Sequence, residues 1–238
     1  MIGDIFKPDT YRETEIFLSQ AHLLVLIVFA ISVAWIFYHR AKPYMKYIRW
    51  VLFGALMLSE VSLIWWTVSI GMWDIRYNLP LNLCTVSLYL AAAMLVTKSY
   101  TLFEIVYFFG IGGALQAMIT PDLFYTFPHF RFLHFFTAHI AIILAVLYMI
   151  AFYKYEVTFR SFIKSLVVLH VLALIVFFIN QMTGANYMFL ARKPSGPSIL
   201  DWFGPYPWYI LALEAITFIT FFILYLPFFI KKRLASPS

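Results

Sequence analysis

The amino-acid sequence predicts an all-α, polytopic membrane protein with seven transmembrane helices in one bundle, its N-terminus outside the cytoplasm and its C-terminus inside. Of the 238 residues, 63% are hydrophobic and only 12% carry a formal charge, whereas a soluble domain averages about a quarter charged residues. The apolar residues fall in seven runs of about 20, the helix length that crosses the hydrocarbon core of a bilayer. Strands are excluded because these runs lack polar alternation, and an open sheet edge cannot be satisfied in lipid.

Each apolar run is predicted to cross the membrane once, so residues 1–238 form a single transmembrane helical domain. The predicted spans are residues 21–38, 50–70, 79–96, 102–119, 132–153, 161–182 and 207–230. The first span is retained rather than cleaved, because basic residues follow it and its end lacks a small-x-small cleavage site. Pro80 and Pro207 lie in the first turns of the third and seventh helices, where a missing N–H is tolerated.

The orientation follows from the Lys and Arg residues that lie outside the spans. One side of the membrane has six: Lys7, Arg12, Arg76, Arg131, Arg192 and Lys193. The other side has eleven: Arg40, Lys42, Lys46, Arg49, Lys98, Lys154, Arg160, Lys164, Lys231, Lys232 and Arg233. Basic residues are retained on the cytoplasmic side, so the second side is predicted to be cytoplasmic.

The net charge of +6 is interpreted as an attraction to anionic lipid at the inner membrane surface. No tract of basic and aromatic residues resembles a nucleic-acid platform. Membrane lipids are therefore the expected partners, nucleic acid is not, and the predicted localisation is the cell membrane, as a multi-pass protein. Cys84 is the single cysteine, which excludes an internal disulfide.

Polar residues inside the predicted spans are the candidates for function, because an ionisable group at the bilayer centre costs about 2.5 to 3.5 kcal/mol. Most of them share a depth band in the outer half of the membrane: Glu60, Cys84, Gln116, His139, Asn180 and Glu214. A polar cavity that opens outward, able to hold a small molecule, is the simplest arrangement. The alternative is that each residue makes its own interhelical hydrogen bond, with no cavity.

The third predicted helix carries the densest set of polar residues. Asn78, Asn82, Thr85 and Tyr89 recur at helical spacing, and Cys84 lies on a neighbouring stripe. A nucleophilic cysteine needs a helix N-terminus or a nearby cation to favour its thiolate. Cys84 lies just beyond the first predicted turn, and Arg76 precedes it. The alternative is that Cys84 is a small, packed hydrophobic residue.

Histidines are spaced five apart, at His129, His134 and His139. Five residues turn about 140° on a helix, so His134 and His139 do not share the face that a metal site requires, and no metal is expected. His139 is a candidate general base, because imidazole titrates near physiological pH. The alternative is a structural histidine with satisfied hydrogen bonds.

The outer segment before the last span, residues 186–209, is long, contains four prolines and is rich in aromatic residues. It is interpreted either as a lid over the cavity or as an interfacial anchor. Arg192 and Lys193 in this segment are candidates to bind a lipid phosphate. The chain contains no Walker loop, dinucleotide fingerprint or nucleophile elbow, so no cofactor is expected.

Several short motifs together resemble the YwaF-like integral membrane proteins of bacteria. They are Leu79-Pro-Leu-Asn-Leu-Cys84, Gln116 with Thr120-Pro-Asp122, His134-Phe-Phe with His139, Asn186-Tyr-Met-Phe-Leu, Lys193-Pro and Gly204-Pro-Tyr-Pro-Trp-Tyr209. The resemblance covers essentially the whole chain. The family's vertebrate relatives are assigned to acyl transfer between phospholipids, so the resemblance implies Cys84 as acyl acceptor and His139 as its base. Where that family often has histidine two residues before the cysteine, this chain has Asn82, which cannot act as a base.

Three functions compete on these observations. In an acyltransferase, Cys84 or a water attacks an ester, His139 moves the proton, and Asn82 or Gln116 stabilises the oxyanion. In a small-solute carrier, Glu60 and Glu214 couple transport to protons. A third hypothesis is a lipid-binding protein without turnover. The candidate substrate-binding residues are Glu60, Asn82, Gln116, His134, Asn180, Arg192, Lys193 and Glu214.

Overall fold

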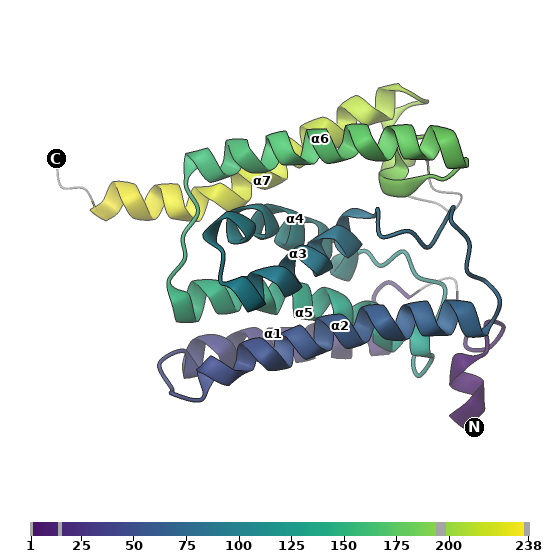
Figure 1. The fold of residues 1–238 in the computed structure, drawn as a ribbon, viewed down its shortest axis with the longest axis horizontal. Helices are drawn as coiled ribbons and strands as arrows, with labels where there is room; N and C mark the ends of the chain where they lie inside the picture. Colours follow the sequence, from purple (N-terminus) through teal and green to yellow (C-terminus); the bar gives the residue numbers. More distant parts are fainter. Residues whose placement is uncertain (1, 14–15, 194–198, 236–238) are drawn as a thin grey trace. The chain divides into compact units, whose positions relative to one another are not determined.

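The computed structural model describes residues 2–13, 16–193 and 199–235, and this part of the chain is helical (Figure 1). Its seven α-helices are α1 (Gln20–His39), α2 (Met45–Ser69), α3 (Leu83–Thr97), α4 (Tyr100–Ile119), α5 (Phe130–Tyr153), α6 (Phe159–Thr183) and α7 (Trp208–Ala235). Three short 3-10 helices accompany them: η1 (Ile2–Phe6), η2 (Tyr187–Phe189) and η3 (Ile199–Phe203). The described residues contain no β-strand, which confirms the all-helical prediction.

Six of the described helices are long and apolar enough to cross a membrane: α1, α2, α4, α5, α6 and α7. They match six of the seven predicted spans, and the chain is therefore a multi-pass membrane protein by length and composition. The seventh candidate, α3, has only 15 residues. At 1.5 Å per residue it extends about 22 Å, against a hydrocarbon core of about 30 Å. A seventh crossing, and the orientation of the termini, stay predictions.

The start of α3 differs from the prediction for a local reason. The third span was predicted from residue 79, but the helix begins at Leu83, so Pro80 precedes the helix. The residues before it form hydrogen-bonded turns. The side chain of Asn78 accepts a hydrogen bond from the backbone N–H of Asp74 at 2.9 Å. An asparagine that closes such a turn competes with helix formation, and this delays the helix.

Contacts between residues divide the chain into two compact units. The first unit comprises Met1–Trp73 with Ser87–Tyr155, and the second comprises Asp74–Val86 with Glu156–Ser238. The boundary falls within the first turns of α3. A single domain over the whole chain stays a prediction.

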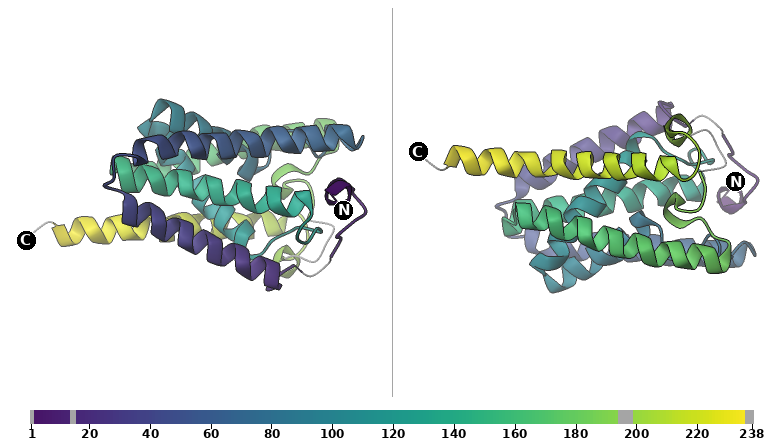
Figure 2. Two further views of the ribbon diagram at one scale, coloured as in Figure 1. Left: turned by 90° about the horizontal axis from the view of Figure 1, so that it is seen from below. Right: turned by 90° about the horizontal axis from the view of Figure 1, so that it is seen from above.

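In the first unit, α5 is the central helix, and α1, α2 and α4 pack against it. Figure 2 shows α5 between α1 and α2. Small residues on α5 allow close approach: Ala138, Ala141 and Ala145 are all buried. Gly110 of α4 lies so near that an added Cβ would stand 2.9 Å from Ile142 Cγ2. This unit therefore has a densely packed core around α5.

In the second unit, α6 and α7 pack against each other. Aromatic side chains join them, with the Phe162 ring 5.4 Å from Phe218 and 6.3 Å from Tyr225. Gly184 ends α6 with a left-handed φ of 71°, which glycine adopts without a steric penalty. The chain after Gly184 then folds back, and η2 packs on α6.

Candidate functional site

A network around Asn180 and Tyr187 organises the polar end of the second unit. Asn180 on α6 is 2% exposed. Its side chain binds both backbone groups of Tyr187, accepting from the N–H at 2.9 Å and donating to the carbonyl at 3.0 Å. The Tyr187 hydroxyl in turn donates to the carbonyl of Ile75 at 2.6 Å and accepts from the N–H of Leu79 at 2.8 Å. These hydrogen bonds join residues 75–79, which precede Cys84, to residues 180–187, far away in the sequence.

The backbone in this loop is strained at two consecutive residues. Met188 and Phe189 have φ values of 56° and 55°, a left-handed region that costs a residue other than glycine about 1 to 3 kcal/mol. Hydrogen bonds hold the strained residues in place. The Asn82 side chain accepts from the Met188 N–H at 3.3 Å, and the Tyr209 hydroxyl donates to the Phe189 carbonyl at 2.6 Å. The sequence predicts that Asn82 and Asn180 contact substrate; in the structure the side chains of both residues form hydrogen bonds that hold this loop.

Cys84 is the second residue of α3 and lies in its first turn, because the helix begins at Leu83. Its thiol is free and partly buried. The first turn of a helix presents backbone N–H groups that stabilise negative charge. Arg76, which the sequence offered as a nearby cation, is instead paired with the Asp74 carboxylate at 2.6 Å and lowers the pKa of Asp74 to about 2. Arg76 is therefore not available to Cys84, and of the two features that could favour its thiolate only the helix N-terminus remains.

Arg192 and Lys193 lie on the same loop. The Asn186 side chain accepts from the Arg192 N–H at 3.0 Å and donates to the Arg192 carbonyl at 2.8 Å. This turn leaves the Arg192 side chain exposed. The Lys193 ammonium lies 5.8 Å from the centre of the Tyr209 ring, within the range of a cation–π contact. Arg192 is thus exposed and Lys193 is half-buried, and residues 194–198 of the predicted lid lie outside the described residues.

Glu214 on α7 pairs with His170 on α6, with 3.0 Å between the carboxylate and His170 Nε2. Glu214 also lines a cavity of about 350 Å³ with Phe177, Leu190 and Trp208. The sequence identified Glu214 as a candidate but did not indicate His170 as its partner. The fact that α6 and α7 pack together could not be read from periodicity alone.

In the first unit, Glu60 on α2 is 6% exposed. The hydroxyl of Tyr89 on α3 donates to its carboxylate at 3.0 Å. This is an interhelical hydrogen bond of the kind that satisfies polar residues in helical bundles. Glu60, Asn180 and Glu214 thus each have a specific partner. The contacts of these three residues therefore agree with the alternative interpretation of the sequence, in which each polar residue makes its own hydrogen bond.

A second polar group in the first unit centres on Arg131, near the start of α5. Its guanidinium donates to His134 Nδ1 at 3.1 Å and lies 5.9 Å from the Trp66 ring centre. Because a guanidinium can only donate, His134 Nδ1 must accept, and Nε2 then carries the proton in the neutral ring. That Nε2 is buried without a hydrogen-bond partner among the described residues. Arg131 was counted only as a topological charge in the sequence reasoning.

His139 lies one and a half turns further along α5 and is 8% exposed. Its Nδ1 lies 2.6 Å from the carbonyl of Phe135. A carbonyl only accepts, so Nδ1 holds the proton and Nε2 carries the lone pair in the neutral ring. His139 is therefore in the tautomer that a base acting through Nε2 requires. Gln116 on α4, by contrast, is exposed.

The structure brings the predicted residues together in two groups. Asn82, Cys84, Asn180, Arg192, Lys193 and Glu214 belong to the second unit, and Glu60, Gln116, His134 and His139 belong to the first. Cys84 and His139 lie in different units, so a pairing between them stays a prediction, as does one common pocket for all ten residues.

The TMEM164 family model matches residues 17–225 of the chain. No curated protein and no solved structure matches it.

Proposed function

The chain belongs to the TMEM164 family of transmembrane proteins, and on this basis we propose that it transfers acyl groups between phospholipids from a polar pocket that opens outward. The observation that carries the proposal is the position of Cys84 in the first turn of α3. Backbone N–H groups at a helix N-terminus favour negative charge, whether on a thiolate or on the oxygen of a tetrahedral intermediate. The resemblance to YwaF-like proteins supports the same chemistry.

The proposed reaction has two halves. The Cys84 sulfur attacks the ester carbonyl of a donor phospholipid, a thioester forms, and the lysophospholipid leaves with its hydroxyl reprotonated. The hydroxyl of an acceptor lysophospholipid then attacks the thioester, which restores the thiol. His139 Nε2 takes and returns the proton in both halves. A water activated by His139 in place of the thiol would give hydrolysis instead.

The remaining predicted residues have supporting roles in this proposal. Arg192 and Lys193 contact the lipid phosphate. The Asn82 amide nitrogen is the donor that an oxyanion needs, because the Asn82 oxygen already accepts from Met188. Asn180 fixes the loop that carries Arg192 and Lys193. The proposed location is the cell membrane, with the pocket on the outer side.

The test is transfer of a labelled acyl chain from phosphatidylcholine to a lysophospholipid by the purified full chain. Cys84→Ala should abolish transfer, and His139→Ala should reduce the rate by about 100-fold or more. His39→Ala is the matched control, because His39 Nδ1 also contacts the carbonyl four residues earlier, Trp35, at 3.0 Å but on the surface. A thioester intermediate predicts that label bound to the protein is released by neutral hydroxylamine. Undiminished transfer in Cys84→Ala and His139→Ala would remove both residues from the mechanism.

A small-solute carrier is the second candidate, and the pairing of His170 with Glu214 beside a cavity favours it. A carboxylate and an imidazole in contact within apolar helices can exchange a proton during transport. Transport into liposomes driven by a pH gradient, lost in Glu214→Gln and kept in Cys84→Ala, would support the carrier and contradict the transferase.

A further inference from the structure

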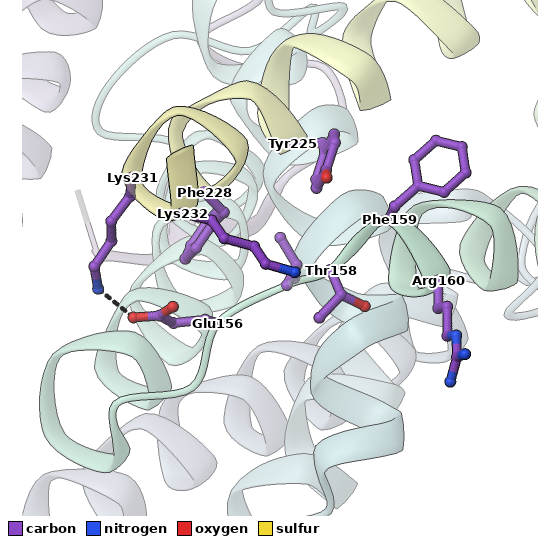
Figure 3. Close-up of a pocket in the computed structure, with 9 residues that line it drawn as sticks. Glu156, Thr158, Phe159, Arg160, Tyr225, Phe228, Lys231 and Lys232 are labelled. Atoms are coloured by element: carbon purple, nitrogen blue, oxygen red, sulfur yellow. Dashed lines mark hydrogen bonds and ion pairs between the residues drawn. The ribbon is translucent and has the colours of Figure 1, made fainter. Parts of the chain in front are cut away.

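A second cavity lies at the opposite end of α6 from the Asn180 network, where α6 begins and α7 ends. It has a volume of about 740 Å³ and is lined by residues of both helices and of the segment 156–158 that leads into α6 (Figure 3). Arg160 directly precedes the predicted sixth span, and Lys231 and Lys232 directly follow the seventh. The cavity therefore lies at the ends of two spanning helices, at the level where lipid headgroups meet water.

The polar lining of this cavity is predominantly basic. Arg160, Lys231 and Lys232 line the cavity together with one carboxylate, Glu156, which gives a formal net charge of +2. Lys231 is paired with Glu156. The Lys232 side chain extends toward Thr158 in Figure 3, and no carboxylate within the described residues pairs with it. Lys232 and Arg160 are thus the cations available to a ligand.

The N-terminus of α6 adds hydrogen-bond donors at the same place. Thr158 caps this 25-residue helix, and a capping box between Thr158 and Ser161 occupies two of the first backbone N–H groups. For the two N–H groups between them, those of Phe159 and Arg160, no hydrogen-bond partner is found in the described residues. Free N–H groups at the positive end of a helix dipole bind phosphate. These donors and the cations above point to an anionic ligand.

The rest of the lining is apolar or aromatic: Val157, Phe159, Tyr225 and Phe228. A free inorganic anion has no apolar surface to bury against this lining, so the lining would not contribute to its affinity. A molecule that carries a phosphate beside a glycerol backbone and acyl chains would bury apolar surface against it. The arrangement of basic residues between helix ends is also one that lipid headgroups occupy in other membrane proteins.

We propose that this cavity binds the phosphate headgroup of an anionic phospholipid from the adjacent leaflet. The phosphate contacts Lys232, Arg160 and the first N–H groups of α6, and the glycerol and upper acyl chains contact Tyr225 and Phe228. This site is separate from the Cys84 region and does not depend on acyl transfer. Its ligand is held by the junction of α6 and α7, so binding should stabilise the second unit.

The test is equilibrium binding of fluorescent short-chain phosphatidic acid to the full chain in a neutral detergent. Phosphatidic acid should bind about tenfold more tightly than phosphatidylcholine of the same chain length. Lys232→Ala should weaken it about tenfold, the value of one charge-assisted contact. Arg160→Gln should do the same. Arg233→Ala is the matched control, because Arg233 is the next residue but its guanidinium lies 5.1 Å from the Phe229 ring centre and does not line the cavity.

Three results would overturn the proposal. The first is equal affinity for phosphatidic acid and phosphatidylcholine. The second is equal weakening by Lys232→Ala and Arg233→Ala, which would indicate attraction to the basic surface as a whole. The third is displacement of the lipid by inorganic phosphate at equal concentration, which would indicate a free phosphate site. Thermal unfolding of each variant without lipid should match wild type, since Lys232 and Arg160 are exposed.

Discussion

His129 shows how single residues fix the first unit. Its ring caps α5, with Nδ1 accepting from the Arg131 N–H at 3.0 Å. Nε2 therefore carries the proton and donates to the Lys7 carbonyl at 3.0 Å, which ties the N-terminal segment to the helix. The ring also stacks on Tyr125, with 4.0 Å between centres. Burial lowers the pKa of His129 below its ordinary value of 6.5.

This lowered pKa predicts a loss of stability in mild acid. Between the folded and unfolded pKa values the unfolded chain binds the extra proton, so stability is full above about pH 6.5 and falls as the pH drops below it. His129→Asn keeps an acceptor for the helix cap but does not titrate. Thermal unfolding in detergent between pH 7.5 and 5 should show a smaller decline for His129→Asn than for wild type. Equal declines would mean that other groups cause the acid sensitivity.

The sequence identified polar residues well but could not assign their partners. Asn180 was expected to contact substrate because it lies at a helix end in the membrane. In the structure its side-chain amide binds the backbone N–H and carbonyl of Tyr187, and a contact with substrate stays a prediction. Arg131 was treated as a topological charge, although it contacts His134 on its own helix. Residues three positions apart on a helix are neighbours, so the sequence could have indicated the contact between Arg131 and His134.

At the element scale, hydropathy predicted six long helices, with ends that differ by up to five residues, because a long apolar run has one stable conformation in lipid. It placed the start of α3 four residues early. Hydropathy does not distinguish a helical turn from a non-helical turn that side-chain hydrogen bonds stabilise. Asn78 and Tyr187 supply those hydrogen bonds. Tyr187 lies 108 residues from Leu79, so no local sequence pattern could have predicted this hydrogen bond.

The contact between α4 and α5 gives a prediction about helix packing. Gly110→Ala would place a Cβ 2.9 Å from Ile142 Cγ2, and the β-branched Ile142 has little rotamer freedom in a helix. Overpacking of this kind costs about 1 to 3 kcal/mol, so the unfolding temperature should fall. Gly54→Ala on α2 is the matched control, because a Cβ there meets nothing within 4 Å. It should be neutral or stabilising by up to about 1 kcal/mol. Equal effects of the two substitutions would contradict the close α4–α5 packing.

At the scale of the whole molecule, orientation is the property that the sequence predicts and that labelling can test. In a Cys84→Ala background, a cysteine at Trp202 in η3 should react with an impermeant maleimide on intact cells. A cysteine at Lys42 should react only after permeabilisation, because the α1–α2 loop is predicted to be cytoplasmic. Both positions are exposed, with 88% exposure for Trp202. The reverse pattern would invert the protein and move the Cys84 pocket to the inner side.

The sequence was sufficient for the all-helical class and for six of the seven predicted spans, because these depend on composition. It was not sufficient for the candidate site. Whether Cys84 and His139 meet depends on packing between helices that hydropathy treats as equivalent. The basic cavity at the start of α6 was also missed, because Arg160 and Lys232 are more than 70 residues apart and each was counted only as a cytoplasmic charge.

The short α3 has a consequence for the bilayer itself. If α3 crosses the membrane, it falls about 8 Å short of the hydrocarbon thickness. A bilayer relieves such hydrophobic mismatch by thinning next to the short helix, at a cost of a fraction of a kcal/mol per ångström. The compressed lipids would lie beside the turn before Cys84. The protein would then favour membranes of shorter or less ordered acyl chains, and bilayer thickness would help to determine in which membrane it resides.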